Sequence, residues 1–470
     1  MSRHIESYEQ AIEFLYNRIN YERISGSAYT AADFRLDRMR ELLRRLGDPQ
    51  EMIPAVHIAG TKGKGSTAAM ISRITMAAGY RTGLFTSPHL TAFEERMSVN
   101  GQLPTPEQIV ELVNAVSEPV AEMDKSPGRQ CPTYFEIATA MAWLYFANQR
   151  AELAVLEVGL GGRLDATNVC RPEVTVITTI SRDHTRCLGS RLSQIAGEKA
   201  GIVKMGIPMV SGVTQPEPAD SIATVCRGLS APLWQLARDF SYDYFPNRPE
   251  GNSPGERNGT LAVSVGDRRW SCLPIVLRGE HQAHNAAVAV VTVDLLRQRG
   301  WEIPESSFAD GLRQVRWPAR IEVVGTQPTV IVDAAHNWAA IEALLKTLDD
   351  FPVRRRVLVF AGTQDKDVGG MLRQLLPKFD SVIVTNYLNN PRAVAAEELS
   401  RQAAQLAEAP IHLTHDPVSA WKLARRLATR EDLICITGSF FIAAEMRDVI
   451  LETTDEDNSP STRDDIGQRR

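Results

Sequence analysis

The segment at residues 56–70, VHIAGTKGKGSTAAM, decides the fold of the first part of this chain. Its apolar beginning predicts a strand over 55–59, the glycines predict a tight turn, and residues 66–80 have the composition of a helix. A strand, a glycine turn and a helix in this order provide the context for a loop that binds phosphate groups. In the usual phosphate loop the hydroxyl residue directly follows the lysine, whereas the order at 63–66 is Gly-Lys-Gly-Ser. The segment alone leaves two interpretations open, a nucleotide site of another kind and a glycine turn without a chemical role.

The composition is that of an ordinary globular protein, and it argues against several classes. The 470 residues are 43% hydrophobic and 23% charged, which is enough material for two or three domains. The net charge of −5 does not favour a general nucleic-acid binder, and no apolar run has the roughly 18 residues that a membrane span needs. The N-terminus lacks the apolar segment of a secretory signal, and the six cysteines are scattered without a CxxC pair. We therefore expect a cytoplasmic enzyme or binding protein with reduced thiols, no cysteine metal site, and no nucleic-acid or membrane partner.

Strands and helices alternate along most of the chain, which predicts an α/β protein with parallel sheets covered on both faces. We expect a P-loop ATPase-type parallel sheet domain over 1–317, a hinge near 316–320, a smaller Rossmann-like α/β domain over 318–452, and a disordered tail over 453–470. A stretch rich in Pro, Gly, Asn and Arg at 242–270 is expected to be an exposed loop or hairpin insertion. Besides 55–59, the expected strands cover 81–89, 153–162, 173–181 and 207–213 in the first series, and 329–337, 356–363, 381–386, 411–416 and 432–439 in the second.

Four groups of polar residues follow expected strands, at the edge where parallel sheets bind their ligands. They are the glycine loop, Ser87 with His89, Glu157 with the glycine run after it, and Asp183 with His184. A triphosphate requires a magnesium ion, which prefers carboxylate, hydroxyl and water oxygens. An ionised glutamate after an apolar strand is costly unless it binds something, so Glu157 is a candidate ligand.

Each of these signals has an alternative. Glu157 is equally well explained by a helix cap or by a salt bridge to Arg163, and His184 alone fits a hydrogen-bonded structural histidine better than a ligand. His281 and His284 have the spacing of a metal pair on a helix but lack a nearby acidic partner, so we expect a structural or ligand-positioning role for them. The shared sheet edge is what favours one common site.

Longer motifs match a known family in order along most of the chain. HIAGTKGKGST, FTSPHL, FEIATAMAWLYF, LEVGLGGRLDATN and IAGEKAGIVK occur first, followed by GEHQAHNAAVA, GLRQVRWPARIE, DAAHN, DKD, PRA and TGSFF. Through these motifs the chain resembles the folylpolyglutamate synthase and dihydrofolate synthase family of the Mur ligase superfamily. The Gly-Lys-Gly-Ser order is that family's own form of the phosphate loop, so the resemblance favours the nucleotide interpretation.

The resemblance implies a role for each matching residue. By this resemblance, ATP is bound by the loop residues Gly60, Thr61, Gly63, Lys64, Gly65, Ser66 and Thr67. Three further residues are implied to bind it: Asn285 near the adenine, Arg320 near the phosphates and Asp333 near the ribose. The resemblance also implies two Mg²⁺ ions. Ser87 and Glu157 would bind the ion that bridges the phosphates, and His184 would bind the second. Lys199 matches a lysine that family members carry as a carbamate, and His336 and Ser439 match residues near the incoming glutamate. The catalytic residues implied are Lys64, His184, Lys199 and His336.

The chain departs from the family pattern at two places. Ala334 and Trp338 stand where family members often have Gly and Pro, and Thr179 and Arg182 stand where they commonly have Asn and an apolar residue. These departures concern substrate contacts rather than the ATP chemistry.

The resemblance implies an ATP-dependent acid–amino-acid ligase that adds L-glutamate to a folate, to dihydropteroate, or to both, and we expect a monomer. ATP would convert a substrate carboxylate into an acyl phosphate, which the amine of glutamate then attacks. One alternative is a Mur-type ligase for another carboxylate, although the segment before residue 56 is too short for the precursor-binding domain that such ligases usually carry. The others are a non-catalytic ATP-binding regulatory protein and a P-loop ATPase coupled to motion.

Overall fold

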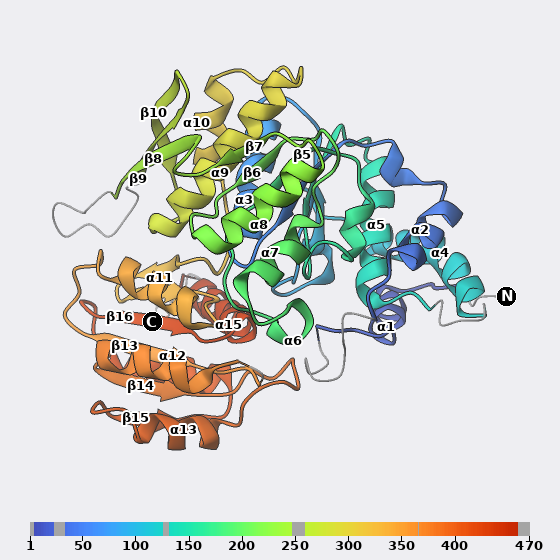
Figure 1. Ribbon diagram of the computed structural model, residues 1–470. Coiled ribbons are helices and arrows are strands. Elements are labelled where there is room, and N and C mark those ends of the chain that lie inside the picture. The colour runs from blue at the N-terminus through green and yellow to red at the C-terminus, as the bar shows by residue number, and fades with distance from the viewer. Residues whose placement is uncertain (1–3, 23–32, 126–130, 247–258, 365, 459–470) are drawn as a thin grey trace, which may run out of the picture. The chain divides into compact units, whose positions relative to one another are not determined.

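The chain folds into two compact units, Met1–Trp317 and Pro318–Arg470, called here the first and the second unit (Figure 1). The structure is a computed structural model that describes residues 4–22, 33–125, 131–246, 259–364 and 366–458, the side chains of 454–458 excepted. None of the helices described is long and apolar enough to cross a membrane.

The first unit is built on a seven-stranded sheet with the order β3-β2-β4-β1-β5-β6-β7. Strand β3 is antiparallel to β2, and the other neighbouring strands are parallel, so their carboxyl ends meet at one edge, called here the carboxyl edge of the first sheet. The strands are β1 (Ala55–Ala59), β2 (Thr82–Phe85), β3 (Met97–Val99), β4 (Leu153–Glu157), β5 (Pro172–Ile177), β6 (Met209–Ser211) and β7 (Leu233–Gln235). The predicted α/β class with a parallel sheet is confirmed.

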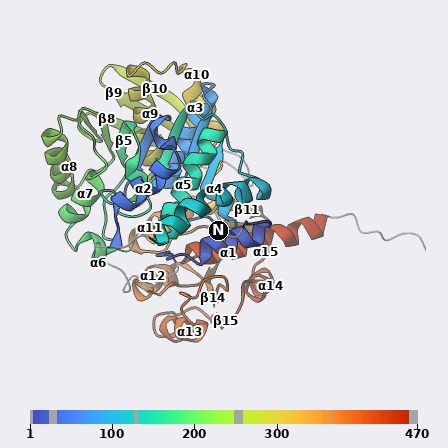
Figure 2. The same ribbon diagram turned by 90° about the vertical axis from the view of Figure 1, so that its right-hand side faces the viewer.

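Helices cover both faces of this sheet because its central strands are apolar on both sides. In β4, Leu153 and Val155 pack into the core beneath α3, α9 and α10, whereas Ala154 and Leu156 pack against α1, α2, α4 and α5. Helices α7 and α8 lie side by side in both views and cover the sheet near β5 and β6 (Figures 1 and 2). The helices are α1 (Tyr8–Tyr16), α2 (Leu36–Arg45), α3 (Lys64–Ala77), α4 (Pro106–Asp124), α5 (Tyr134–Asn148), α6 (Thr185–Leu188), α7 (Leu192–Ala200), α8 (Pro216–Gly228), α9 (Glu280–Gln298) and α10 (Ser306–Arg313).

The region predicted as an exposed insertion is a small antiparallel sheet with the order β10-β9-β8. Its strands are β8 (Phe240–Phe245), β9 (Gly259–Val265) and β10 (Arg268–Ile275), and residues 247–258 lie outside the described residues. Leu261, Val263 and Trp270 are buried in the core beside α9 and α10. The prediction of a hairpin insertion is confirmed, whereas the expectation of exposure was wrong for one face of β9, because one side chain in two along this strand faces the core.

The second unit is built on a six-stranded sheet with the order β11-β12-β16-β13-β14-β15. Strand β11 is antiparallel to β12 and the remaining pairs are parallel, so this sheet also has a carboxyl edge. The strands are β11 (Glu322–Thr326), β12 (Thr329–Val332), β13 (Arg356–Phe360), β14 (Ser381–Val384), β15 (Ile411–Leu413) and β16 (Leu433–Thr437).

Five helices accompany the second sheet in the described part of the chain. They are α11 (Trp338–Leu348), α12 (Val368–Leu375), α13 (Ala396–Ala404), α14 (Pro417–Leu427) and α15 (Phe440–Asn458). Helix α15 continues to Asn458, so residues 453–458 are helical and the disordered tail was predicted to begin too early. The remainder of that prediction, 459–470, lies outside the described residues.

Candidate active site

The glycine loop joins the end of β1 to the start of α3 at the carboxyl edge of the first sheet. Gly63 is the N-cap of α3 with φ of 84°, a left-handed conformation that favours glycine. A Cβ atom on Gly63 would lie 2.2 Å from Oδ1 of Asn285, so only a glycine lets the loop pack against α9 here. The first amides of α3 have no partner within the helix, and such amides bind phosphate oxygens.

Hydrogen bonds hold this loop against the segment that follows β5. The amide of Thr61 donates to the carbonyl of Thr179 (2.8 Å), and the amide of Lys62 donates to the hydroxyl of Thr179 (3.0 Å). In return, the hydroxyl of Thr178 donates to the carbonyl of Lys62 (2.6 Å). The loop is therefore preorganised by side chains and backbone from a neighbouring strand end. Thr179, one of the departures from the family pattern, takes part in this anchoring.

Glu157 is the last residue of β4, and its carboxylate is buried at the carboxyl edge. Nζ of Lys64 lies 3.8 Å from Oε1 of Glu157, and the amide of Ser87 donates to Oε2 (3.3 Å). A Cβ atom on Gly65 would lie 2.9 Å from the ring of Trp317 and 3.1 Å from the same Oε2, which explains the extra glycine after the lysine. Arg163, the alternative partner, pairs instead with Glu198 at 2.9 Å. The loop lysine, the glutamate and the serine predicted from separate motifs thus lie together.

Lys199 projects from α7 into the same edge of the sheet. Its Nζ atom is buried and donates to the carbonyl of Gly60 at 2.9 Å. Burial, followed by the nearby positive charge of Lys64, lowers the pKa of Lys199 to about 7, although the carboxylate of Asp183 opposes the shift. A substantial fraction of this lysine is therefore a neutral amine at neutral pH.

His184 is joined to the glycine loop through its neighbour Asp183. Nζ of Lys62 lies 3.1 Å from Oδ2 of Asp183, and Nε2 of His184 lies 3.8 Å from Oδ1. His184 itself has a left-handed backbone with φ of 49°, and its side chain is 44% exposed. A half-exposed imidazole beside a carboxylate remains accessible to a ligand, and a buried structural histidine would not be.

Sequence reasoning missed a buried network under this edge. Asp165 accepts hydrogen bonds from the amide of Leu160 (2.8 Å) and from the amide and hydroxyl of Thr167 (3.0 and 2.5 Å), and Thr167 in turn contacts Nε2 of His57 at 2.8 Å. Burial raises the pKa of Asp165, while the hydrogen bonds and the charge of Lys64 act against that shift. The available signal was an acidic residue inside the glycine-rich motif after β4.

His89 has a defined structural partner. Nε of the fully buried Arg96 donates to Nδ1 of His89 (2.7 Å), which places the proton of a neutral imidazole on Nε2. The same guanidinium donates to both carboxylate oxygens of Glu22 (2.9 and 2.5 Å) and lies over the ring of Tyr134. The N-terminal segment is therefore tied to the chain segment that carries Ser87.

In the second unit, Asp333 follows β12 and organises the segment that carries Arg320. Its buried carboxylate accepts the amides of Ile321 and Ala335, each at 2.9 Å. Ile321 has φ of 49°, an unusual conformation for a β-branched residue, so these bonds hold a strained backbone. Burial raises the pKa of Asp333, and the guanidinium of Arg320 opposes the shift.

His336 and Ser439 lie on adjacent loops at the carboxyl edge of the second sheet. The amide of Gly438 donates to the carbonyl of Ala335 (3.0 Å), which joins the loop after β16 to the loop after β12. Nδ1 of His336 donates to the carbonyl of Ala334 (2.9 Å), so the neutral ring presents Nε2 as its acceptor. The hydroxyl of Ser439 is buried and contacts that of Thr363 at 2.9 Å.

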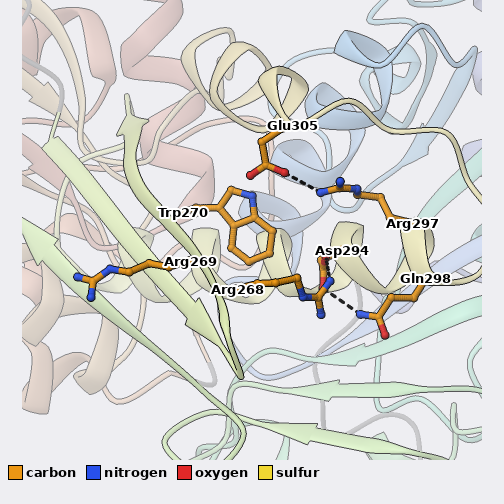
Figure 3. Close-up of a pocket in the computed structure, with 7 residues that line it drawn as sticks. All are labelled: Arg268, Arg269, Trp270, Asp294, Arg297, Gln298 and Glu305. Carbon is orange, nitrogen blue, oxygen red and sulfur yellow. Dashed lines mark hydrogen bonds and ion pairs between the residues drawn. The ribbon is translucent and has the colours of Figure 1, made fainter.

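A cavity of about 390 Å³ is formed by other residues of the first unit (Figure 3). It is lined by Arg268, Arg269, Trp270, Asp294, Arg297, Gln298 and Glu305. The rise of an α-helix places Asp294 and Gln298 roughly 14–20 Å along α9 from Asn285. Its arginines already pair with carboxylates, Arg268 with Asp294 and Arg297 with Glu305. None of the predicted site residues lines this cavity, so we assign the chemistry to the sheet edges.

The histidine pair on α9 does not form a metal centre in the described residues. Nε2 of His284 contacts the carbonyl of Thr178 at 3.3 Å, and burial lowers the pKa of His284. Nowhere in the described part of the chain do three His, Cys, Asp or Glu side chains gather as a metal-binding group. A structural role for His284 agrees with the sequence analysis.

Comparisons with known proteins identify both units. Residues 58–293 match the Mur ligase middle domain, and residues 319–440 match the Mur ligase, glutamate ligase domain. The chain is 34% identical over 444 residues to the Dihydrofolate synthase/folylpolyglutamate synthase of Bacillus subtilis (strain 168), covering 94% of this chain and 98% of that protein.

Solved structures agree with these matches. Mycobacterium tuberculosis folylpolyglutamate synthase complexed with ADP and AMPPCP has a TM-score of 0.84 and 33% identity, covering 95% of this chain and 99% of that one. E. coli FolC in complex with DHPP and ADP has a TM-score of 0.80 and 30% identity, covering 98% of this chain and 100% of that one. The chain therefore belongs to the folylpolyglutamate synthase/dihydrofolate synthase family of Mur ligases.

Proposed function

We propose that this chain is an ATP-dependent ligase that joins L-glutamate to a folate or to dihydropteroate through an acyl phosphate. The observation that carries the proposal is the pairing of Lys64 with the buried Glu157 at 3.8 Å, directly beside the glycine loop. A lysine, a carboxylate and free helix amides at one sheet edge suit a nucleotide triphosphate with its metal ion.

The reaction requires activation because a carboxylate has no adequate leaving group at neutral pH. Transfer of the γ-phosphoryl group of ATP to a carboxylate oxygen releases ADP and forms an acyl phosphate. The neutral amine of glutamate then attacks the acyl carbon, the amine proton is lost, and inorganic phosphate leaves as the amide forms. Both steps move negative charge onto phosphate oxygens, which fixed positive charges stabilise.

In this proposal the first unit binds the nucleotide. Lys64 and the amides near Gly63, Gly65 and Ser66 hold the phosphates, and Asn285, which packs against Gly63, lies near the base. The hydrogen bonds from Thr61 to the segment after β5 keep the loop in the binding conformation before ATP arrives. Little reorganisation is then needed when the phosphates bind.

The same edge has the donor set for magnesium. Ser87 and Glu157 would hold one ion and His184 a second, and a buried carboxylate with a serine beside it fits a cation that keeps several waters and phosphate oxygens. When bound, Mg²⁺ neutralises the phosphate oxygens during transfer. Lys64 would then move its contact from Glu157 toward the phosphates.

Lys199 is proposed to carry a carbamate. A neutral amine adds to carbon dioxide and loses one proton, which converts a buried cation into an anion, and the low pKa of Lys199 supplies that neutral amine. Carbon-13-labelled bicarbonate should give a carbonyl resonance that disappears in Lys199→Ala. Full activity in Lys199→Arg would reject the carbamate, since arginine cannot form it in the same way.

The second unit is proposed to serve glutamate and the nucleotide. Arg320 would contact ATP phosphates and Asp333, which orders the backbone at Ile321, would lie near the ribose. His336 presents an acceptor nitrogen, as required for a partner of the glutamate ammonium, and Ser439 would bind glutamate.

The test is an assay of the purified protein with ATP, Mg²⁺, glutamate and either dihydropteroate or tetrahydrofolate. We expect phosphate release that depends on both glutamate and the pteridine substrate, with an amide product detected by mass spectrometry. Phosphate release without either substrate would indicate an ATPase, and no release would indicate a regulatory protein. The relative rates decide between the two substrates. A monomeric state and a cytoplasmic location stay predictions.

A further inference from the structure

Three buried hydroxyl groups meet at the carboxyl edge of the second sheet. Thr363, Tyr387 and Ser439 follow β13, β14 and β16, which are neighbours in the sheet, and each residue is at most 5% exposed. The hydroxyl of Tyr387 donates to Oγ1 of Thr363 (2.9 Å), and Oγ1 of Thr363 lies 2.9 Å from Oγ of Ser439. The amide of Phe441 also donates to Oγ of Ser439 (3.1 Å).

Counting hydrogens gives this chain of hydroxyls a direction. Each hydroxyl has one hydrogen and two lone pairs. Because Tyr387 donates to Thr363, the hydrogen of Thr363 is available for Ser439. With Thr363 as the donor in that contact, Oγ of Ser439 accepts from both Thr363 and Phe441, so its lone pairs are occupied and its own hydrogen is left to donate. A serine in this state binds an acceptor such as a carboxylate and not an ammonium group.

We propose that Tyr387 and Thr363 are positioning residues that make Ser439 a hydrogen-bond donor for a carboxylate of the incoming glutamate. The inference rests on the proposed function, because it takes glutamate as the substrate, and it adds which group of glutamate Ser439 binds and what orients the serine. Neither Tyr387 nor Thr363 needs to touch the substrate.

The electrostatic surroundings agree with an anionic ligand. Burial raises the pKa of Tyr387, so the phenol stays protonated and able to donate, although the positive charge of Arg392 acts against the shift. The nearby carboxylate of Glu445 accepts the amides of Leu388 and Asn389, each at 2.8 Å. The negative charge of Glu445 is therefore already engaged by the backbone, and Arg392 adds a positive charge to this part of the edge.

The experiment compares steady-state kinetics of the full-length wild type, Tyr387→Phe, Ser439→Ala and the double variant. Tyr387→Phe keeps the ring and removes one hydrogen, so we expect a KM for glutamate about 3–10-fold higher, with the KM for ATP and kcat nearly unchanged. Ser439→Ala should raise the KM for glutamate at least as much. Since Tyr387 acts through Ser439, the double variant should be no worse than Ser439→Ala.

Two further variants separate positioning from packing. Thr363→Ser keeps a hydroxyl at the same place and should retain the wild-type KM for glutamate, whereas Thr363→Val has a similar shape without the hydroxyl and should resemble Tyr387→Phe. Tyr145→Phe, which removes a phenol that donates to Gln102 in the first unit, serves as the control and should change no kinetic constant. Melting temperatures of all variants show whether each one is folded.

The results distinguish the inference from the proposed function. Two results with an active wild type would overturn the positioning role of Tyr387 and Thr363 but leave the proposed function standing. One is an unchanged KM for glutamate in Tyr387→Phe, and the other is effects of Tyr387→Phe and Ser439→Ala that multiply in the double variant. Equal increases in the KM for ATP and for glutamate would do the same. A wild type that releases no phosphate in the presence of glutamate and either pteridine substrate would overturn the proposed function, and this inference with it.

Discussion

The surroundings of Glu157 separate the two roles that its sequence context leaves open. As a helix cap or a partner of Arg163 it would affect only stability, but Arg163 pairs with Glu198, and the carboxylate of Glu157 lies near Lys64 and the amide of Ser87. Its place agrees with the proposed role of Glu157 beside the phosphate loop. The carboxylate and its two neighbours come from three different strand ends, which is why a local pattern cannot distinguish the two roles.

Replacing Glu157 by Gln tests this role, because the shape is kept and only the negative charge is lost. We expect ligation to fall by at least about 100-fold, with partial recovery at high Mg²⁺, and the free energy of unfolding to change by about 1 kcal/mol or less. Glu152→Gln, just before the other end of β4, is the matched control and should be fully active. Activity close to wild type in Glu157→Gln would show that this carboxylate holds no metal ion.

Lys199 provides a pH dependence with a definite sign. Its pKa is about 7 in the folded protein, whereas an unfolded lysine titrates near 10.4. Between these values the unfolded chain binds more protons at this group, so its contribution to the free energy of unfolding increases with pH, by up to about 1.4 kcal/mol per unit. We expect urea unfolding in carbon-dioxide-free buffer from pH 7 to 9.5 to show this slope, and Lys199→Met to lose it. Equal slopes in both proteins would mean that Lys199 has an ordinary pKa.

Among the elements, those with strong local patterns were predicted and those defined by distant partners were not. The apolar strands β1, β4 and β16 and the glycine loop follow from periodicity and composition, and the α/β class is confirmed. Strands β3 and β11 are short antiparallel edge strands whose existence depends on pairing with β2 and β12. Strand β9 was read as exposed because the polar residues beside it dominate the local composition.

In the candidate site, too, residues in distinctive local motifs were predicted and residues defined by other contacts were not. The glycine loop, Ser87, Glu157 and Lys199 were named from sequence because they stand in distinctive motifs, and the structure brings them together. Asp165 was missed although its partners Leu160 and Thr167 are close to it in sequence, whereas Arg96 was missed because its partner is distant. Arg96 contacts Glu22, 74 residues away, and nothing near Arg96 in sequence indicates this.

The contact between the N-terminal segment and the Ser87 segment can be tested at Arg96. Its guanidinium is fully buried and forms forked bonds to Glu22 and a third bond to His89, which a lysine ammonium cannot reproduce. We expect Arg96→Lys to lower the free energy of unfolding by about 2–4 kcal/mol. The control is Arg44→Lys, whose side chain is 63% exposed and whose ion pair with Glu41 is screened by solvent, so its stability should hardly change. Similar small changes in both variants would mean that the buried pair is not what fixes this segment.

For the molecule as a whole, each unit has its own carboxyl edge, and the residues proposed for one reaction are divided between them. The phosphate loop, Glu157 and Lys199 belong to the first unit, and His336 and Ser439 belong to the second. Each edge is ordered by its own hydrogen bonds. In one, the hydroxyl of Thr179 donates to the carbonyl of Lys62, and in the other the amide of Ile321 donates to the carboxylate of Asp333. Substitutions of His336 or Ser439 should therefore affect glutamate transfer more than nucleotide binding.

His336→Ala tests this division. The imidazole belongs to the second unit and presents Nε2 as an acceptor, because Nδ1 donates to Ala334. A partner for the glutamate ammonium is needed only after the acyl phosphate has formed, so we expect ligation to fall by about 100-fold or more, while the Kd for a non-hydrolysable ATP analogue changes less than about 3-fold. Initial rates and calorimetric titration measure the two quantities. His415→Ala, an exposed histidine of the same unit paired with Glu397, should alter neither. Equal losses of nucleotide affinity and ligation in His336→Ala would place this histidine in the nucleotide site instead.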